Sequence, residues 1–309
     1  MTEKSNINID LLTKWIHDEK CILILGPDIV FDFQKSLLKE LSDYLINNGI
    51  ECKFDAYDEL FSSNTDFDPF FFAELSDFYN KLETKPIYQK IAEIPFNLII
   101  SLSPDLLLKK VFDDNNFDYS FDFYNKILNP KPIENPTIVK PLVYNLLGNY
   151  KEFDSLVLCF RDVFNFLSTI LGNNQLNNDL KYKINSAQSI LFLGFKYDKW
   201  YFKLILQLLN LNEKAIKQAS KNELENIENQ NLLIDFYKNE FKIRFIPAKG
   251  TEILDLLHTH YKENNKLRKP KQQTSTSNSI TNIINVADSK DVTILQNVDA
   301  NNINLRQNK

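Results

Sequence analysis

Cysteine, histidine and glycine are all scarce in this chain of 309 residues, which has three cysteines, three histidines and six glycines. The cysteines are Cys21, Cys52 and Cys159, and they lie far apart without forming a Cys-x-x-Cys pair. Their spacing argues against a disulfide framework and against a structural zinc site. We expect the three cysteines to be small buried hydrophobic residues.

Long apolar runs and a strong positive charge are also missing. No stretch has the length of a transmembrane helix, and the N-terminal residues lack a signal-peptide core, so we expect a cytoplasmic protein that does not enter a membrane. The net charge is −5, which argues against general nucleic-acid binding because such proteins need a basic face. The basic run 262–271 is better explained as a solvated linker.

The few glycines that are present fall at informative positions. Gly26, Gly148 and Gly194 each directly follow a short apolar run that is typical of a buried strand. A glycine at the carboxyl end of a strand permits a tight turn and the close approach of a ligand, and in open α/β sheets nucleotides bind at that edge. The alternative is that these glycines simply end their strands.

Strand-like and helix-like segments alternate from residue 1 to residue 265. This pattern predicts an α/β domain with a Rossmann-like, mostly parallel sheet and helices on both faces. Residues 113–141 are expected to be rich in loops, with one or two short elements. The predicted strands are 21–25, 51–54, 97–102, 142–147, 156–159, 189–193 and 242–246. The predicted helices are 6–17, 34–47, 68–93 with a division at Pro86, 106–112, 162–171, 177–186, 199–209, 214–240 and 251–262.

The C-terminal segment differs in composition from the rest of the chain. Residues 266–279 form a polar linker, and residues 280–309 contain short β-branched pieces separated by Asn, Asp and Ser. So short a segment cannot bury a core alone. It is either disordered or a β-rich oligomerisation stem that stacks with copies of itself.

Four segments in order resemble the motifs of the sirtuin-like domain family. The family's Gly-Ala-Gly-x-Ser loop corresponds to Leu25–Ile29, and its Thr-Thr-Asn-Tyr-Asp motif corresponds to Ser101–Asp105. Its Lys-Leu-His-Gly motif corresponds to Asn145–Gly148, and its Gly-Tyr-Ser-x-x-Asp turn corresponds to Leu193–Trp200. The resemblance covers about residues 10–265. It implies a site that binds NAD or an ADP-ribose-like nucleotide, without zinc because the cysteines of the family's zinc module are missing.

Two positions depart from the family in a way that matters for catalysis. In the family, an asparagine of the second motif positions ribose and water, and a histidine of the third motif is the general base. Ser103 and Leu147 stand at those positions here, and leucine cannot accept a proton. Pro27 and Asp28 replace two small residues of the first loop, and the Asp28 carboxylate would repel a pyrophosphate.

The resemblance and the departures together predict the site residues. Asp28 and Asp105 are the candidate catalytic residues, although each also fits a structural position at the start of a helix. The predicted nucleotide-binding residues are Gly26, Pro27, Ser101, Ser103, Asn145, Gly148 and Gly194.

Three functions are consistent with this sequence. The first is a sirtuin-like protein of a bacterial antiviral or conflict system that binds the nucleotide with weak or no hydrolysis. The second is a pseudoenzyme scaffold that oligomerises through its tail, or recruits a partner protein. The third is an active NAD-depleting effector.

Overall fold

The computed structural model describes residues 8–29, 36–62, 67–172, 176–209, 211, 213–221, 224 and 228–271. These residues belong to one compact unit that ends at Lys271. The predicted tail, 280–309, and the part of the linker beyond Lys271 lie outside the described residues.

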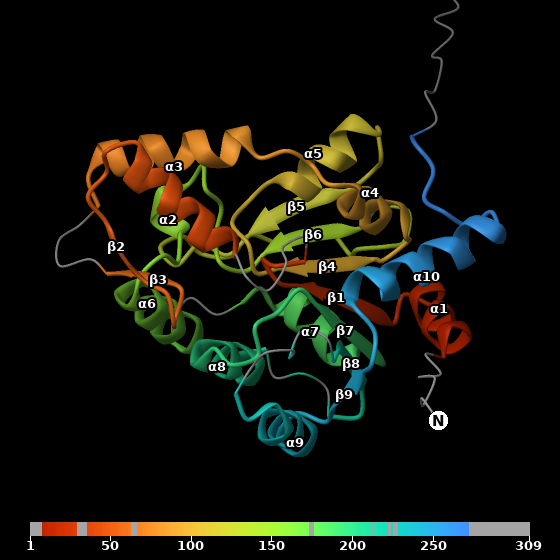
Figure 1. Cartoon of the computed structure of the whole chain (residues 1–309). Helices are drawn as coiled ribbons and strands as arrows, with labels where there is room; N and C mark the ends of the chain where they lie inside the picture. Colours follow the sequence, from red (N-terminus) through yellow and green to blue (C-terminus); the bar gives the residue numbers. More distant parts are fainter. Residues whose placement is uncertain are drawn as a thin grey trace, which may run out of the picture. The chain divides into compact units, whose positions relative to one another are not determined.

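A parallel sheet with the strand order β5-β6-β4-β1-β7-β8-β9 forms the centre of this unit (Figure 1). The strands are β1 (Cys21–Leu25), β4 (Leu98–Ser101), β5 (Ser120–Phe123), β6 (Leu142–Asn145), β7 (Ser189–Leu193), β8 (Ile216–Ser220) and β9 (Ile243–Ile246). The predicted Rossmann-like α/β class is confirmed, as are the predicted strands at 21–25, 97–102, 142–147, 189–193 and 242–246. The central strand β1 is apolar at every position because helices cover both of its faces.

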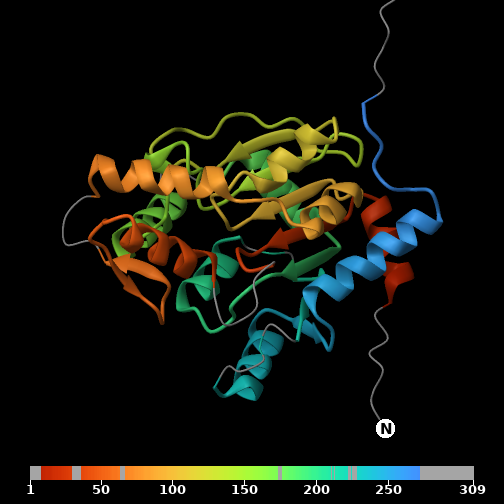
Figure 2. The same ribbon diagram turned by 45° about the horizontal axis from the view of Figure 1, so that its top comes forward.

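Helices cover the two faces of the sheet in separate groups (Figure 2). One face packs against α1 (Ile9–His17), α4 (Pro86–Glu93), α5 (Leu107–Asp114) and α10 (Gly250–Glu263). The other packs against α6 (Phe160–Leu171), α7 (Asn178–Ser186), α8 (Trp200–Leu208) and α9 (Gln230–Glu240). None of the described helices is both long enough and apolar enough to cross a membrane.

A smaller cluster lies between β1 and β4 in the sequence and at the left of the view in Figure 1. It contains α2 (Leu37–Asn47), the antiparallel hairpin of β2 (Lys53–Asp55) and β3 (Leu60–Ser62), and α3 (Pro69–Lys81). Phe61 and Phe71 pack edge to face in its core, together with Leu156 and Leu158 from the loop before α6. This cluster therefore ties the segment after β1 to the segment after β6.

The predicted strand at 156–159 is wrong. Leu156 closes a 3-10 turn onto Phe153, and the amide groups of Leu158 and Cys159 donate to the Asp162 carboxylate at 3.1 and 3.2 Å. The segment makes only an isolated bridge from Cys159 to Phe61. Its backbone donors cap α6 and are unavailable for a strand ladder.

The predicted continuous helix at 214–240 is also wrong in its first part. Ile216–Ser220 is the strand β8, which pairs with β7 and β9, and α9 begins at Gln230. Lys217 and Gln218 gave this strand a polar sequence, yet Lys217 is buried, and burial lowers the pKa of its ammonium group. A buried lysine in a strand is rare, so the sequence pattern favoured a solvated helix.

Candidate functional site

A cavity lies at the carboxyl ends of β1, β4 and β7, where the smaller cluster meets the sheet. In a parallel sheet this edge is the usual ligand site, because loops and helix N-termini converge there. Most of the cavity wall is apolar, including Leu102, Phe166 and Phe202. Its polar wall residues are Asp28, Ser36, Glu59, Tyr79, Ser103, Lys196, Lys199 and Tyr201.

The loops after β1 and β7 are locked together by their backbones. The amide of Gly26 donates to the Leu193 carbonyl at 2.8 Å, and the amide of Asp28 donates to the Gly194 carbonyl at 3.1 Å. A Cβ atom at Gly26 would lie 2.0 Å from the Gly194 carbonyl oxygen. Gly26 is therefore required for the contact between the two loops, and two of the first loop's amides already have protein acceptors.

Asp28 faces the cavity from the first loop. One of its carboxylate oxygens accepts the amide of Leu37, the first residue of α2, at 3.4 Å. Burial raises the pKa of the Asp28 carboxyl to about 7, although the Lys196 charge acts in the opposite direction. Asp28 thus combines a helix N-terminal contact with a proton affinity in the range of a general base.

Four predicted site residues form one buried network at the ends of β4 and β6. Ser103 donates its hydroxyl to the Asp105 carboxylate, whose other oxygen accepts the Leu107 amide at 2.9 Å. The Asn145 side chain donates to the Asp105 carbonyl at 2.8 Å, and the Ser101 hydroxyl accepts the Ser103 amide at 3.1 Å. Burial raises the pKa of the Asp105 carboxyl.

Of this network, only Ser103 is part of the cavity wall. Leu147 lies on the same wall, so the two positions matched to the family's asparagine and histidine face one cavity. Gly148 has a φ of 95°, and a Cβ there would lie 2.4 Å from the Ser155 carbonyl oxygen. The roles of the predicted site residues remain predictions, but the structure places Pro27, Asp28 and Ser103 at the same cavity.

Three charged residues of the cavity were missed by the sequence reasoning. Lys196 forms an ion pair with Glu59, and Lys199 donates to the Tyr57 carbonyl. The two lysines were detectable as charges directly after the Gly194 turn, where α/β proteins often bind anions. Glu59 lies in the turn before β3. No sequence pattern marks it as a site residue, because only the fold brings it to the cavity.

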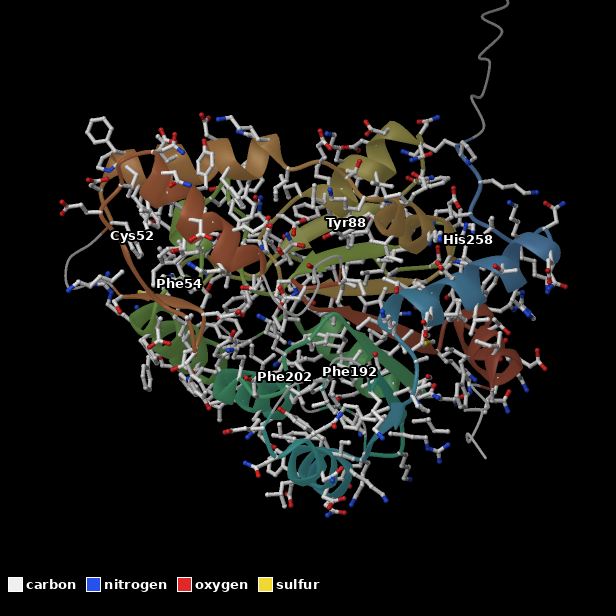
Figure 3. The ribbon with its side chains drawn as sticks, viewed as in Figure 1. Cys52, Phe54, Tyr88, Phe192, Phe202 and His258 are labelled. Carbon is white, nitrogen blue, oxygen red and sulfur yellow. The ribbon has the colours of Figure 1, made fainter. Side chains whose placement is uncertain are left out.

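All three histidines lie on helices away from the cavity. His17 ends α1, whereas His258 and His260 lie on α10. His258 bonds to Glu93 of α4 at 2.5 Å, and Figure 3 shows it on the opposite side of the view from Phe54 of β2. No imidazole is therefore available to the cavity as a base.

The described residues contain no group of three or more His, Cys, Asp or Glu side chains arranged to hold a metal ion. No curated protein matches the chain. Residues 97–246, from the start of β4 to the end of β9, match the family model of the SIR2-like domain. The match supports the resemblance to the sirtuin-like domain family over this part of the chain.

Proposed function

We propose that this protein binds NAD or an ADP-ribose-like nucleotide at the cavity and hydrolyses it weakly or not at all. SIR2-like domains generally bind NAD, which supports the ligand class. The observation that carries the proposal is the position of Ser103 and Leu147, which lie on one cavity wall where the family resemblance expects the asparagine and the catalytic histidine. A leucine there supplies no proton acceptor.

Asp105, Lys196 and Lys199 already have partners in the protein. Asp105 is held by the Ser103 hydroxyl and the Leu107 amide, so both of its oxygens are already used. Lys196 is paired with Glu59, and the Lys199 ammonium donates to the Tyr57 carbonyl. These contacts favour binding over turnover.

Active hydrolysis is the second candidate function, and one observation favours it. Asp28 is a carboxyl in the cavity wall with its pKa raised to about 7, which is the range of a general base. In this alternative Asp28 would accept a proton from water, and Asp28→Asn would abolish nicotinamide release while leaving nucleotide binding intact.

The fit of NAD to the observed cavity is partial. Lys196 and Lys199 are suited to the phosphates and Ser103 to a ribose hydroxyl, since these groups lie on the cavity wall. The amides of Gly26 and Asp28 bond to protein carbonyls, so the first loop does not cradle phosphates in the way a glycine-rich loop does. We therefore assign the phosphates to the β7–α8 loop.

The proposed cellular role is a bacterial antiviral or conflict system in the cytoplasm. In that setting a nucleotide-binding module without a base would sense NAD or its products and recruit a partner, rather than deplete NAD. The support is the family resemblance together with the departures at Ser103 and Leu147.

Calorimetric titration with ADP-ribose and with NAD tests the proposed ligand. We expect saturable binding by the full chain and its loss in Leu147→Trp, because a tryptophan there fills the cavity. Leu232→Trp is the matched control, since Leu232 is 68% exposed on α9 and is not part of the cavity wall. Equal binding by both variants, or no binding by the wild type at millimolar nucleotide, contradicts the proposal.

A further inference from the structure

The end of the cavity between β1 and β7 has the features of an anion site. The N-terminal ends of α2 and α8 both reach it, through Leu37 and Lys199. Helix N-termini attract anions, and Lys196 and Lys199 add two positive charges. A phosphate would be expected at this end of the cavity.

The positive groups at this end of the cavity already contact carboxylates of the protein itself. Glu59 pairs with Lys196, Asp198 lies 3.8 Å from Lys199, and Asp28 accepts the Leu37 amide. Asp28 and Asp198 belong to the loops that form the site. Glu59 is different, since it comes from the β2–β3 hairpin.

Local geometry holds Glu59 in this position. The Asp55 carboxylate accepts the amides of Tyr57 and Asp58 at 2.8 Å each, and Glu59 follows with a φ of 56° and is buried. The same hairpin contacts Lys199 through the Tyr57 carbonyl and the Tyr57 ring, whose centroid lies 5.4 Å from the ammonium. The hairpin thus contacts both Lys196 and Lys199.

We propose that Glu59 is an internal competitor for the phosphate groups of the ligand. The inference rests on the proposed nucleotide-binding function and assigns a regulator to the same cavity. A phosphate-bearing nucleotide binds Lys196 only when it displaces the Glu59 carboxylate, so the resting protein has a low affinity for such ligands. A ligand without phosphate does not compete with Glu59.

Calorimetry on the full chain tests this inference with ADP-ribose and adenosine as probes. Glu59→Gln removes the competing charge at nearly constant size, and we expect it to bind ADP-ribose about tenfold more tightly than the wild type, within the usual range of coupling between two binding events. We expect Glu59→Gln and the wild type to bind adenosine with the same affinity. Lys196→Met, added to Glu59→Gln, abolishes the gain.

The matched control is Glu134→Gln, which removes a carboxylate from the surface pair of Glu134 and Lys140 and should leave binding unchanged. Glu59→Asp keeps the charge but shortens its reach to Lys196, so it gives a smaller gain and serves if Glu59→Gln does not fold. Equal ADP-ribose affinity in the wild type and both Glu59 variants overturns the inference and leaves the proposed function standing. An equal gain for adenosine also overturns it. No binding by any variant overturns both.

Discussion

At the scale of single residues, the most unusual group is the Asp28 carboxyl. Burial raises its pKa to about 7, and Glu59 acts in the same direction. The folded protein therefore binds this proton more tightly than the unfolded chain does. The contribution of Asp28 to stability is largest below pH 4 and is lost as the pH rises to about 7.

The variant Asp28→Asn removes this pH dependence, and its amide oxygen can still accept the Leu37 amide. We expect the free energy of unfolding of Asp28→Asn, relative to that of the wild type, to increase by about 1–2 kcal/mol from pH 5 to pH 8. This figure allows for partial solvent screening of the Asp28 carboxyl. Urea unfolding at both pH values measures this increase. An advantage that is equal at the two pH values would show that Asp28 titrates normally.

At the scale of elements, the shape of the cavity depends on the contact between the loops after β1 and β7. Gly26→Ala would place a methyl group against the Gly194 carbonyl, 2.0 Å away before relaxation. We expect a loss of about 2–4 kcal/mol of stability, because backbone must move on both sides. Gly49→Ala is the control, since Gly49 has no atom within 4 Å of a Cβ and only its φ of 80° opposes the change. Its cost should be about 1 kcal/mol. Similar losses in the two variants would contradict the loop contact.

Much of the fold could be predicted from the sequence because the central strands are continuous apolar runs. β1, β4 and β7 are buried on both faces and are bounded by polar turns or glycine, so their pattern is unambiguous. β8 could not be predicted in the same way, because Lys217 and Gln218 interrupt its apolar pattern.

The candidate site was only partly predictable, for a physical reason. Asp28, Ser103 and Leu147 follow strands, and the carboxyl edge of a parallel sheet brings such residues together. Glu59 comes from a hairpin inserted between β1 and β4, and its place at the cavity depends on how that hairpin packs. Nothing local in its sequence encodes that contact.

At the scale of the whole molecule, the end of the described chain is held by a buried arginine. Arg268 donates to the carbonyls of Ala92 and Phe96 at 2.9 Å each, and its guanidinium lies 5.4 Å from the centroid of the Phe112 ring. Arg268→Met should cost about 2–4 kcal/mol, because it leaves buried carbonyls without donors. Arg244→Met on the exposed face of β9 should change stability by less than about 0.5 kcal/mol. Equal unfolding midpoints in denaturant would contradict this role of Arg268.

The predicted β-rich tail gives a prediction about assembly. The sequence of residues 280–309 predicts short strands whose edges another copy would satisfy, so we expect the full chain to form oligomers at micromolar concentration. A chain that ends at Lys271 keeps the bond from the Lys271 amide to the Asn116 carbonyl and should be monomeric. Light scattering compares the molar masses of the two chains in solution. If both are monomers, the tail is not an oligomerisation stem.

The central proposal is that the cavity binds the nucleotide without hydrolysing it, because Leu147 stands where the family resemblance expects the histidine base. Nicotinamide release from NAD by the purified full chain tests it most directly. We expect release at the background rate, because Leu147 and Ser103 stand on the cavity wall where the family resemblance expects a histidine and an asparagine. Turnover of a few per second by the wild type would contradict it, whether that turnover persists in Asp28→Ala and Asp105→Ala or is lost there.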